Sequence, residues 1–225
     1  IPDSACGWDD DKDRNPTSCV YLSSPVRGLM QLLDVWHHIK DRVPDASLDV
    51  FYGWETFPAS LSRLREEVMR NVARLSSQGV RWHGRIPQTE LDQQLPKFGV
   101  WTYPCNFPEG FAIAGIRATA GGCVPTYTGM AALPEIQMPS PYATDGRAWV
   151  EGGREEFAHA AVLALEASKA GTWDRRAARE WARQERTWGR VADRVMVDMT
   201  ERDRELKSRR TKRHDEGVRN ESAPP

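Results

Sequence analysis

The sequence predicts a doubly wound α/β domain, in which helices cover both faces of a parallel sheet. Short runs of β-branched and aromatic residues alternate with stretches whose apolar residues recur every three or four positions. Such alternation is typical of parallel strands joined by crossover helices. The 225 residues, 40% of them hydrophobic, suffice for one domain of this kind plus extensions. We place this domain at residues 18–151.

Three predicted strands, each followed by a helix, form its first half. The strands are CVYL at 19–22, LDVFYG at 48–53 and VRWHG at 80–84. Two long helices and a short one, at 88–97, follow them in turn. The apolar faces of the long helices consist of Leu29, Leu32, Leu33 and Trp36 in the first, and of Leu61, Leu64, Val68, Val72 and Leu75 in the second.

The second half continues with a strand at 98–104, a helix at 109–120 and a strand at 123–127. After it the alternation stops. Two long helices are predicted within 152–200, at 154–170 and 174–199, with Gly171 as the break. The second carries an apolar stripe that we interpret as a packing face: Trp181, Trp188, Ala192, Val195 and Met199.

Both ends of the chain are polar. Residues 1–17 are acidic and rich in turn formers, which indicates an interdomain linker. The D-x-D pattern within DDDKD precedes the first strand, so we interpret it as solvated linker and not as a metal site. Residues 201–225 carry the basic cluster KSRRTKR, and we expect a frayed helix and a disordered tail. Because the chain starts at Ile1 with no basic leader, we expect it to be the back part of a longer protein.

Composition excludes several classes of protein. A net charge of −1 argues against a surface built entirely for nucleic acid, and no apolar stretch reaches the ~20 residues that span a bilayer. The four cysteines form no C-x-x-C pair, so we expect reduced thiols in a cytoplasmic protein. The histidines show no H-E-x-x-H arrangement, and no metal site is expected.

Ligands of parallel sheets bind beyond the carboxyl ends of the strands, so the residues after each strand matter most. These residues are SSPVRG (with Ser23, Ser24, Arg27 and Gly28), HGRIP (with Gly84, Arg85 and Ile86), PCNFPEG, which leads into Gly110, Phe111 and Ala112, and TYTG (with Thr128 and Gly129). Arginines, hydroxyls and a helix N-terminus suit a diphosphate. Glu109 does not, unless it faces a sugar attached to that diphosphate. The alternative interpretation of Glu109 is a carboxylate that only stabilises the N-terminus of the following helix through the helix dipole. The alternative interpretation of Arg85 is a solvated surface charge.

The stretch YPCNFPEGFAIAGIRATAGGCVP at 103–125, with YLSSPVRGLMQLL and RWHGRIPQTEL before it, resembles the C-terminal, nucleotide-sugar-binding domain of group 1 retaining glycosyltransferases of the GT-B fold. The resemblance covers most of residues 1–150. It implies that Glu109 contacts the donor sugar and that Arg27 cradles the diphosphate. It also implies that the backbone at 84–86 holds the base, and that the last tryptophan-rich helix crosses back onto an N-terminal domain.

Arg117 departs from the pattern of that family. It stands where the family has a second glutamate that binds the ribose hydroxyls, and a guanidinium cannot accept their hydrogen bonds. Ala112 also replaces the usual glycine, a milder change. The resemblance implies transfer of a sugar with retention, from a nucleotide diphosphate-sugar and without another cofactor. The acceptor, which is a glycan, lipid, protein or modified nucleic acid, would bind an N-terminal domain that lies outside these residues.

Three functions remain open at this point. The first is a glycosyltransferase donor domain, and the second is a catalytically weakened or non-catalytic nucleotide-sugar-binding or scaffolding domain. A nucleotide-sugar epimerase with a related fold is the third, although that family differs around the helix at 109–120.

Overall fold

The computed structural model describes residues 1–6, 11, 13–55 and 57–221, with the backbone alone at 148, 150 and 208–221. Six strands form one sheet in the order β3-β2-β1-β4-β5-β6, and every neighbouring pair is parallel. The chain thus winds outward from β1 to β3, returns to β4 beside β1, and winds outward in the opposite direction. The prediction of a doubly wound α/β domain is confirmed.

The elements have the following bounds. The strands are β1 (Asn15–Tyr21), β2 (Ser47–Val50), β3 (Val80–Trp82), β4 (Phe98–Tyr103), β5 (Val124–Gly129) and β6 (Thr144–Asp145). The α-helices are α1 (Leu29–Arg42), α2 (Ser62–Leu75), α3 (Gln88–Gln94), α4 (Ile113–Ala120), α5 (Leu133–Ile136), α6 (Gly146–Val150), α7 (Arg154–Ala170), α8 (Arg175–Arg186) and α9 (Trp188–Glu221). Short 3-10 turns are η1 (Asp3–Cys6), η2 (Ala59–Leu61), η3 (Ser76–Gln78) and η4 (Leu95–Lys97).

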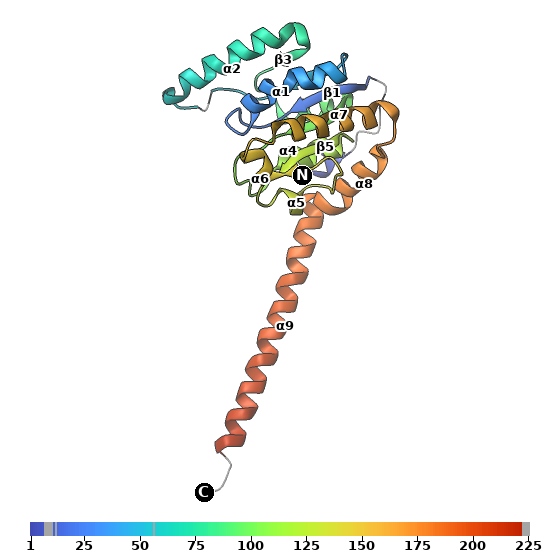
Figure 1. Ribbon diagram of the computed structural model, residues 1–225. Coiled ribbons are helices and arrows are strands. Elements are labelled where there is room, and N and C mark those ends of the chain that lie inside the picture. Colours follow the sequence, from blue (N-terminus) through green and yellow to red (C-terminus); the bar gives the residue numbers. More distant parts are fainter. Residues whose placement is uncertain (7–10, 12, 56, 222–225) are drawn as a thin grey trace.

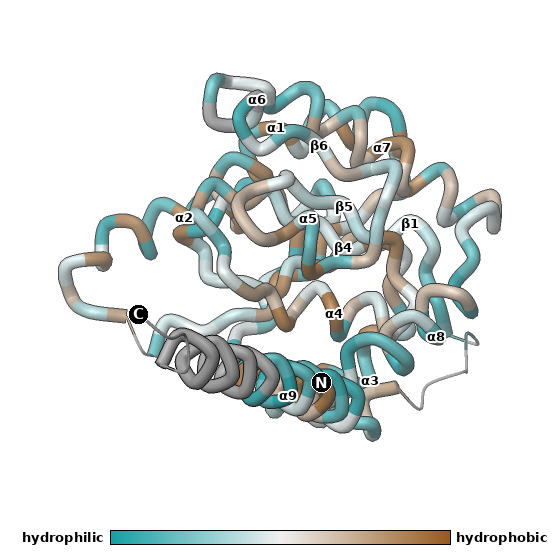
Figure 2. Tube along the Cα trace, turned by 90° about the horizontal axis from the view of Figure 1, so that it is seen from below, coloured by the Kyte–Doolittle hydropathy of each residue, from teal (hydrophilic) through white to brown (hydrophobic). Residues whose placement is uncertain are grey.

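The sheet is the middle of three layers (Figure 2). Helices α1 and α7 pack on each other, and α7 lies across β1, β4 and β5. Helices α3, α4 and α8 lie on the opposite side of the sheet in Figure 2. The central strands β1 and β4 are fully buried along most of their length, because each has a strand on both sides and helices on both faces.

Several boundaries differ from those predicted. Strand β1 begins at Asn15, inside the expected linker, and the expected helix at 109–120 begins only at Ile113. The expected helix at 174–199 is two helices, because Thr187 has extended backbone angles. Helix α9 then runs to Glu221, through most of the expected tail, and an Asp203–Lys207 ion pair one turn apart supports it. Strand β6 was not predicted.

Residues 1–6, at the start of the expected linker, pack against the domain. Ile1 is 2% exposed, and its amino group donates to the carbonyl of Arg186 at 2.7 Å. The amide of Trp188 donates to the carbonyl of Ile1 in return. Turn η1 contacts α4 and α8. Of the D-x-D segment, residues 9, 10 and 12 lie outside the described residues, while Asp11 pairs with arginines of α8.

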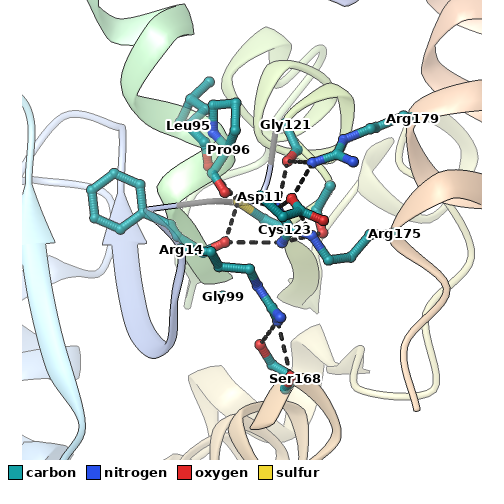
Figure 3. Close-up of polar contacts among 12 residues, drawn as sticks. Asp11, Arg14, Leu95, Pro96, Gly99, Gly121, Cys123, Ser168, Arg175 and Arg179 are labelled. Carbon is teal, nitrogen blue, oxygen red and sulfur yellow. Dashed lines mark hydrogen bonds and ion pairs between the residues drawn. The ribbon is translucent and has the colours of Figure 1, made fainter. Parts of the chain in front are cut away.

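Arg175 ties α8 to the amino-terminal edge of the sheet (Figure 3). Its side chain is 8% exposed, and its Nη atoms donate to four backbone carbonyls at 2.8–3.1 Å, those of Pro96, Phe98, Gly121 and Gly122. It also shares the carboxylate of Asp11 with Arg179. Although burial opposes ionisation, these two arginines hold the pKa of Asp11 below its usual value.

Helix α9 projects away from the body of the domain (Figure 1). The predicted packing stripe is therefore split at Thr187. Trp181 packs against the buried Ile1 and Ala182, whereas Trp188, Val195 and Met199 are 49–63% exposed. None of the helices in the described part of the chain combines the length and apolar character that a bilayer crossing requires.

All four cysteines are buried and carry free thiols. Burial raises the pKa of each, to about 11 for Cys123. We interpret them as packing residues, since a raised pKa leaves little thiolate for chemistry.

We predict that Arg175→Met lowers the free energy of unfolding by about 3–5 kcal/mol, the usual cost of removing one partner from a buried ionic network. Four carbonyls and Asp11 lose a donor in this variant. Urea unfolding checks the value. Arg176→Met is the matched control, since Arg176 is the exposed neighbour on the same helix. Similar losses in both variants would contradict this role of Arg175.

Candidate functional site

The carboxyl edge of the sheet between β1 and β4 is the place where the winding direction reverses. In open α/β sheets this switch point is where ligands bind, because the loops after the two strands diverge there. Here those loops are 22–28, after β1, and 104–112, after β4. Both of the residues predicted to be catalytic, Arg27 and Glu109, lie in these loops.

Gly28 allows the two loops to touch. Its φ of 99° lies in the left-handed region, and a Cβ atom at this position would stand 1.7 Å from the carbonyl oxygen of Pro104. A side chain is therefore excluded on both conformational and steric grounds. The absence of a side chain at position 28 thus lets the backbone of the loop after β4 approach the loop after β1.

Glu109 is the centre of the contacts between the loops. It is only 6% exposed, and its Oε2 atom accepts hydrogen bonds from Arg27 Nη1 and from the hydroxyl of Tyr103, the latter at 2.8 Å. The backbone amide of Phe111 lies 3.4 Å from Oε1. A buried carboxylate with a cationic partner and two further donors is held in one orientation.

Tyr103 was missed by sequence reasoning, which treated it only as part of a strand. It is 1% exposed, and burial raises its pKa well above the ordinary value, so the phenol stays protonated and can donate to Glu109. Ser23 donates to the Tyr103 hydroxyl at 3.3 Å. The hydroxyl of Tyr21 meanwhile fixes the loop after β1 by donating to the carbonyls of Ser24 and Arg27. An aromatic residue ending a strand just before the ligand loops was the available signal.

Arg27 remains accessible despite its ion pair. Its side chain is 33% exposed, whereas that of Glu109 is 8% exposed, and its guanidinium lies 4.8 Å from the centre of the Phe107 ring. The arginine thus faces solvent on one side and the buried carboxylate on the other. This arrangement can offer hydrogen-bond donors to an anion that approaches the switch point.

A cavity of about 400 Å³ lies at the same edge of the sheet, beyond the ends of β1, β2 and β3. Its apolar wall consists of Leu22, Phe51, Tyr52, Ile86 and Leu91, and its other lining residues are Gly53, Glu55, Gly84, Arg85 and Gln88. The structure thus brings together in one pocket the three residues predicted to hold the base. Gly84 has a φ of 72°, which lets the loop turn sharply into the pocket.

The segment Gly110–Ala112 precedes α4 and does not form its first turn, contrary to the prediction. Gly110 has open space where a side chain would stand, and Phe111 is 47% exposed. Ala112 is 7% exposed, and its carbonyl accepts a hydrogen bond from Gln137. The helix starts late because the Glu109 carboxylate holds the Phe111 amide in the preceding turn.

Arg117 donates both of its observed hydrogen bonds to Asp92 on α3, at 2.5 and 2.7 Å. The two side chains are 13% and 9% exposed, and neither lines the 400 Å³ cavity. Arg117 instead joins α4 to α3 through a largely buried ion pair.

Two predicted residues after β5 make internal contacts. Thr128 is fully buried, and its hydroxyl donates to the carbonyl of Cys105 at 2.6 Å. Gly129 pairs with Asp145 in the sheet. In this structure Thr128 fixes the loop that leads to Glu109.

A second cavity, of about 390 Å³, lies beside β2, β3 and α3. Asp49, which is 4% exposed, accepts hydrogen bonds there from Arg81 at 2.7 and 2.8 Å and from His83 at 2.6 Å. His83 also stacks on Phe51. Sequence reasoning missed this cluster, although an aspartate inside an apolar strand was a usable signal. Within the described ranges, no three His, Cys, Asp or Glu side chains gather as a metal site would require.

We predict that Arg117→Glu lowers the free energy of unfolding by about 2–4 kcal/mol, because it places two carboxylates in a largely buried contact. Adding Asp92→Arg in the same chain should recover part of the loss. Chemical denaturation measures both, with Arg63→Glu on the exposed face of α2 as the charge-matched control. A loss no greater than that of the control would show that the pair does not stabilise the fold.

No protein-family profile matches this chain, and no curated protein matches it. Solved structures do resemble it. The chain is similar to an α,α-trehalose-phosphate synthase (UDP-forming) from Burkholderia vietnamiensis, with 14% identity, a TM-score of 0.62, and coverage of 88% of this chain and 45% of that chain. It is also similar to a glycosyltransferase from Rickettsia africae ESF-5 (12% identity, TM-score 0.58, 89% and 55% covered). A third is a mutant of S. aureus TarM in complex with UDP (9% identity, TM-score 0.62, 82% and 35% covered).

The chain spans about a third to a half of the length of these proteins. They are glycosyltransferases of the GT-B class, each built from more than the part that this chain matches. Identities of 9–14% are informative about architecture, and the TM-scores of 0.58–0.62 extend over more than four fifths of this chain. The chain therefore has the fold of a Rossmann-like half of a GT-B glycosyltransferase.

Proposed function

We propose that this chain is the donor-binding domain of a retaining glycosyltransferase, which transfers a sugar from a nucleotide diphosphate-sugar to an acceptor. One observation carries the proposal. At the switch point of the sheet, an accessible arginine and an oriented, buried carboxylate lie side by side, and a cavity with one apolar wall opens at the same edge of the sheet. A diphosphate needs the cation, sugar hydroxyls need the carboxylate, and a base needs the apolar wall.

Arg27 would bind the diphosphate and stabilise the charge that develops on it. In the proposed transfer, the bond between the anomeric carbon and the phosphate oxygen breaks while the acceptor hydroxyl adds to the same face of the sugar, and the proton of that hydroxyl passes to the departing phosphate oxygen. Negative charge then collects on the leaving diphosphate, which a fixed guanidinium stabilises electrostatically. Glu109 would accept hydrogen bonds from the sugar hydroxyls and so hold the anomeric carbon in place.

The acceptor would bind another domain, in the same chain or in a partner. Apolar side chains stand exposed around the switch point, namely Val26, Phe107, Phe111 and Ile113, all 37–48% exposed. Such a rim supports an opposing surface that closes the site and excludes water. The four unpaired, buried thiols support a reducing, cytoplasmic location.

A second candidate, a nucleotide-sugar-binding domain with weakened or no catalysis, is favoured by the Arg117–Asp92 pair. Both candidates bind a donor, and only the first transfers its sugar. Release of nucleoside diphosphate by the full-length protein, in the presence of its acceptor, separates them.

We predict that Glu109→Gln weakens binding of the nucleotide-sugar by about 1.5–3 kcal/mol and changes binding of the bare nucleoside diphosphate much less, since the carboxylate would face sugar hydroxyls. Calorimetric titration with UDP-, GDP- and ADP-sugars and with the three diphosphates measures both. Equal losses for sugar and bare nucleotide would remove Glu109 from the sugar site. A wild-type chain that binds none of the six ligands would refute the proposed function.

We predict that Arg27→Ala weakens both kinds of ligand similarly, by about 1.5–3 kcal/mol, because both carry the diphosphate. The wild type should bind both ligands more weakly at high salt, and this salt dependence should be smaller in the variant. Arg63→Ala, at an exposed position of α2, is the matched control. An affinity unchanged from wild type would mean that Arg27 pairs with Glu109 but does not bind the diphosphate.

A further inference from the structure

The cavity beside the switch point contains one carboxylate among its described lining residues, that of Glu55. Glu55 lies in the loop that follows β2, five residues after the strand ends at Val50. The remaining lining is apolar or offers backbone, amide or guanidinium groups. A ligand in this cavity that presents hydroxyl groups would therefore find its anionic acceptor at position 55.

Gly53 makes room for that carboxylate. A Cβ atom on Gly53 would lie 1.8 Å from Glu55 Oε2 and 2.9 Å from the Cβ of Arg85. The end of the Glu55 side chain thus lies over Gly53, toward the loop after β3, while the residue as a whole remains exposed. Because position 53 has no side chain, the carboxylate lies beside two other residues that line the cavity, Gly53 and Arg85.

The Glu55 carboxylate is also uncommitted. Among the residues that the structure describes, none donates a hydrogen bond to it. Other carboxylates nearby are occupied: Glu109 by Arg27 and Tyr103, Asp92 by Arg117, and Asp49 by Arg81 and His83. An ionised carboxylate only accepts hydrogen bonds, through two oxygens, and so matches the two adjacent hydroxyls of a ribose.

The position of Glu55 agrees with the order of the parts of a nucleotide. If the diphosphate lies at Arg27 and the base against Ile86 and Leu91, the ribose lies between them, beside the ends of β1 and β2. In dinucleotide-binding folds a carboxylate near the end of the second strand accepts a hydrogen bond from the ribose 2′-hydroxyl. Arg117 cannot do so, since it is a pure donor paired with Asp92.

We propose that Glu55 binds the ribose hydroxyls of the donor nucleotide and so selects ribonucleotides over deoxyribonucleotides. This inference rests on the proposed function, because it requires that the cavity holds a nucleotide. It names a specificity residue on the loop after β2, on a different element from α4.

The test is a titration of UDP, GDP and ADP and of their 2′-deoxy forms into the whole chain. For each diphosphate that binds, the wild type should bind the ribose form about tenfold more tightly, the effect of one hydrogen bond to a charged acceptor. Glu55→Gln should reduce that ratio to about two, mainly by weakening the ribose form. Glu66→Gln, an exposed position on α2, is the matched control and should keep the full ratio.

Two further variants separate a direct contact from an indirect one. Gly53→Ala should displace the carboxylate and lower the ratio as Glu55→Gln does, with Glu55 itself unchanged. Arg117→Gln should weaken the ribose and deoxyribose forms equally, through the placement of α3, and so leave the ratio as in the wild type. If Glu55→Gln keeps the full ratio of affinities, the inference is overturned. It is also overturned if Glu55→Gln weakens only the binding of GDP and 2′-deoxy-GDP, and both equally, because that result would indicate a contact to the guanine edge. Absence of binding by all three diphosphates would overturn the proposed function itself, and this inference with it.

Discussion

The close approach of two loops at Gly28 is the constraint on which the site depends. The carbonyl of Pro104 occupies the volume that a side chain at position 28 would need. With the loops in contact, Arg27 on one meets Glu109 on the other, although 82 residues separate them. The reversal of strand order places β1 beside β4 and so makes the contact possible, while the glycine makes it close enough for an ion pair.

That ion pair gives the site a defined arrangement. Glu109 is buried and needs partners, and Arg27 and Tyr103 supply them. A diphosphate would compete with Glu109 for the Arg27 guanidinium, while sugar hydroxyls would compete with Arg27 for the carboxylate. Binding of the two parts of one ligand would thus be coupled, because each releases the partner that the other needs. Tyr103 keeps the carboxylate in place during this exchange.

The apolar periodicity of the sequence predicted the central strands and the covering helices, because buried elements such as β1, β4, α1 and α7 need apolar residues at regular positions. The gathering of the residues that follow the strands was equally predictable, since parallel strands end at one edge of the sheet. Contacts that depend on the packing of separate elements could not be predicted. Nothing in the local sequence shows that Asp11 meets α8, that Arg117 meets Asp92, or that Thr187 ends a helix whose apolar pattern continues. Strand β6 is two residues long, too short for any periodicity.

Arg117 shows that a residue that differs from a family motif can affect a binding site without lining it. Its guanidinium holds Asp92 on α3, and the residue before Asp92, Leu91, lines the cavity beside the switch point together with Gln88 of the same helix. A carboxylate at position 117 would repel Asp92 and release α3 from α4. Position 117 therefore affects the cavity beside the switch point through the placement of its wall, while the proposed hydrogen-bond acceptor, Glu55, lies on the loop after β2, where Gly53 leaves room for it.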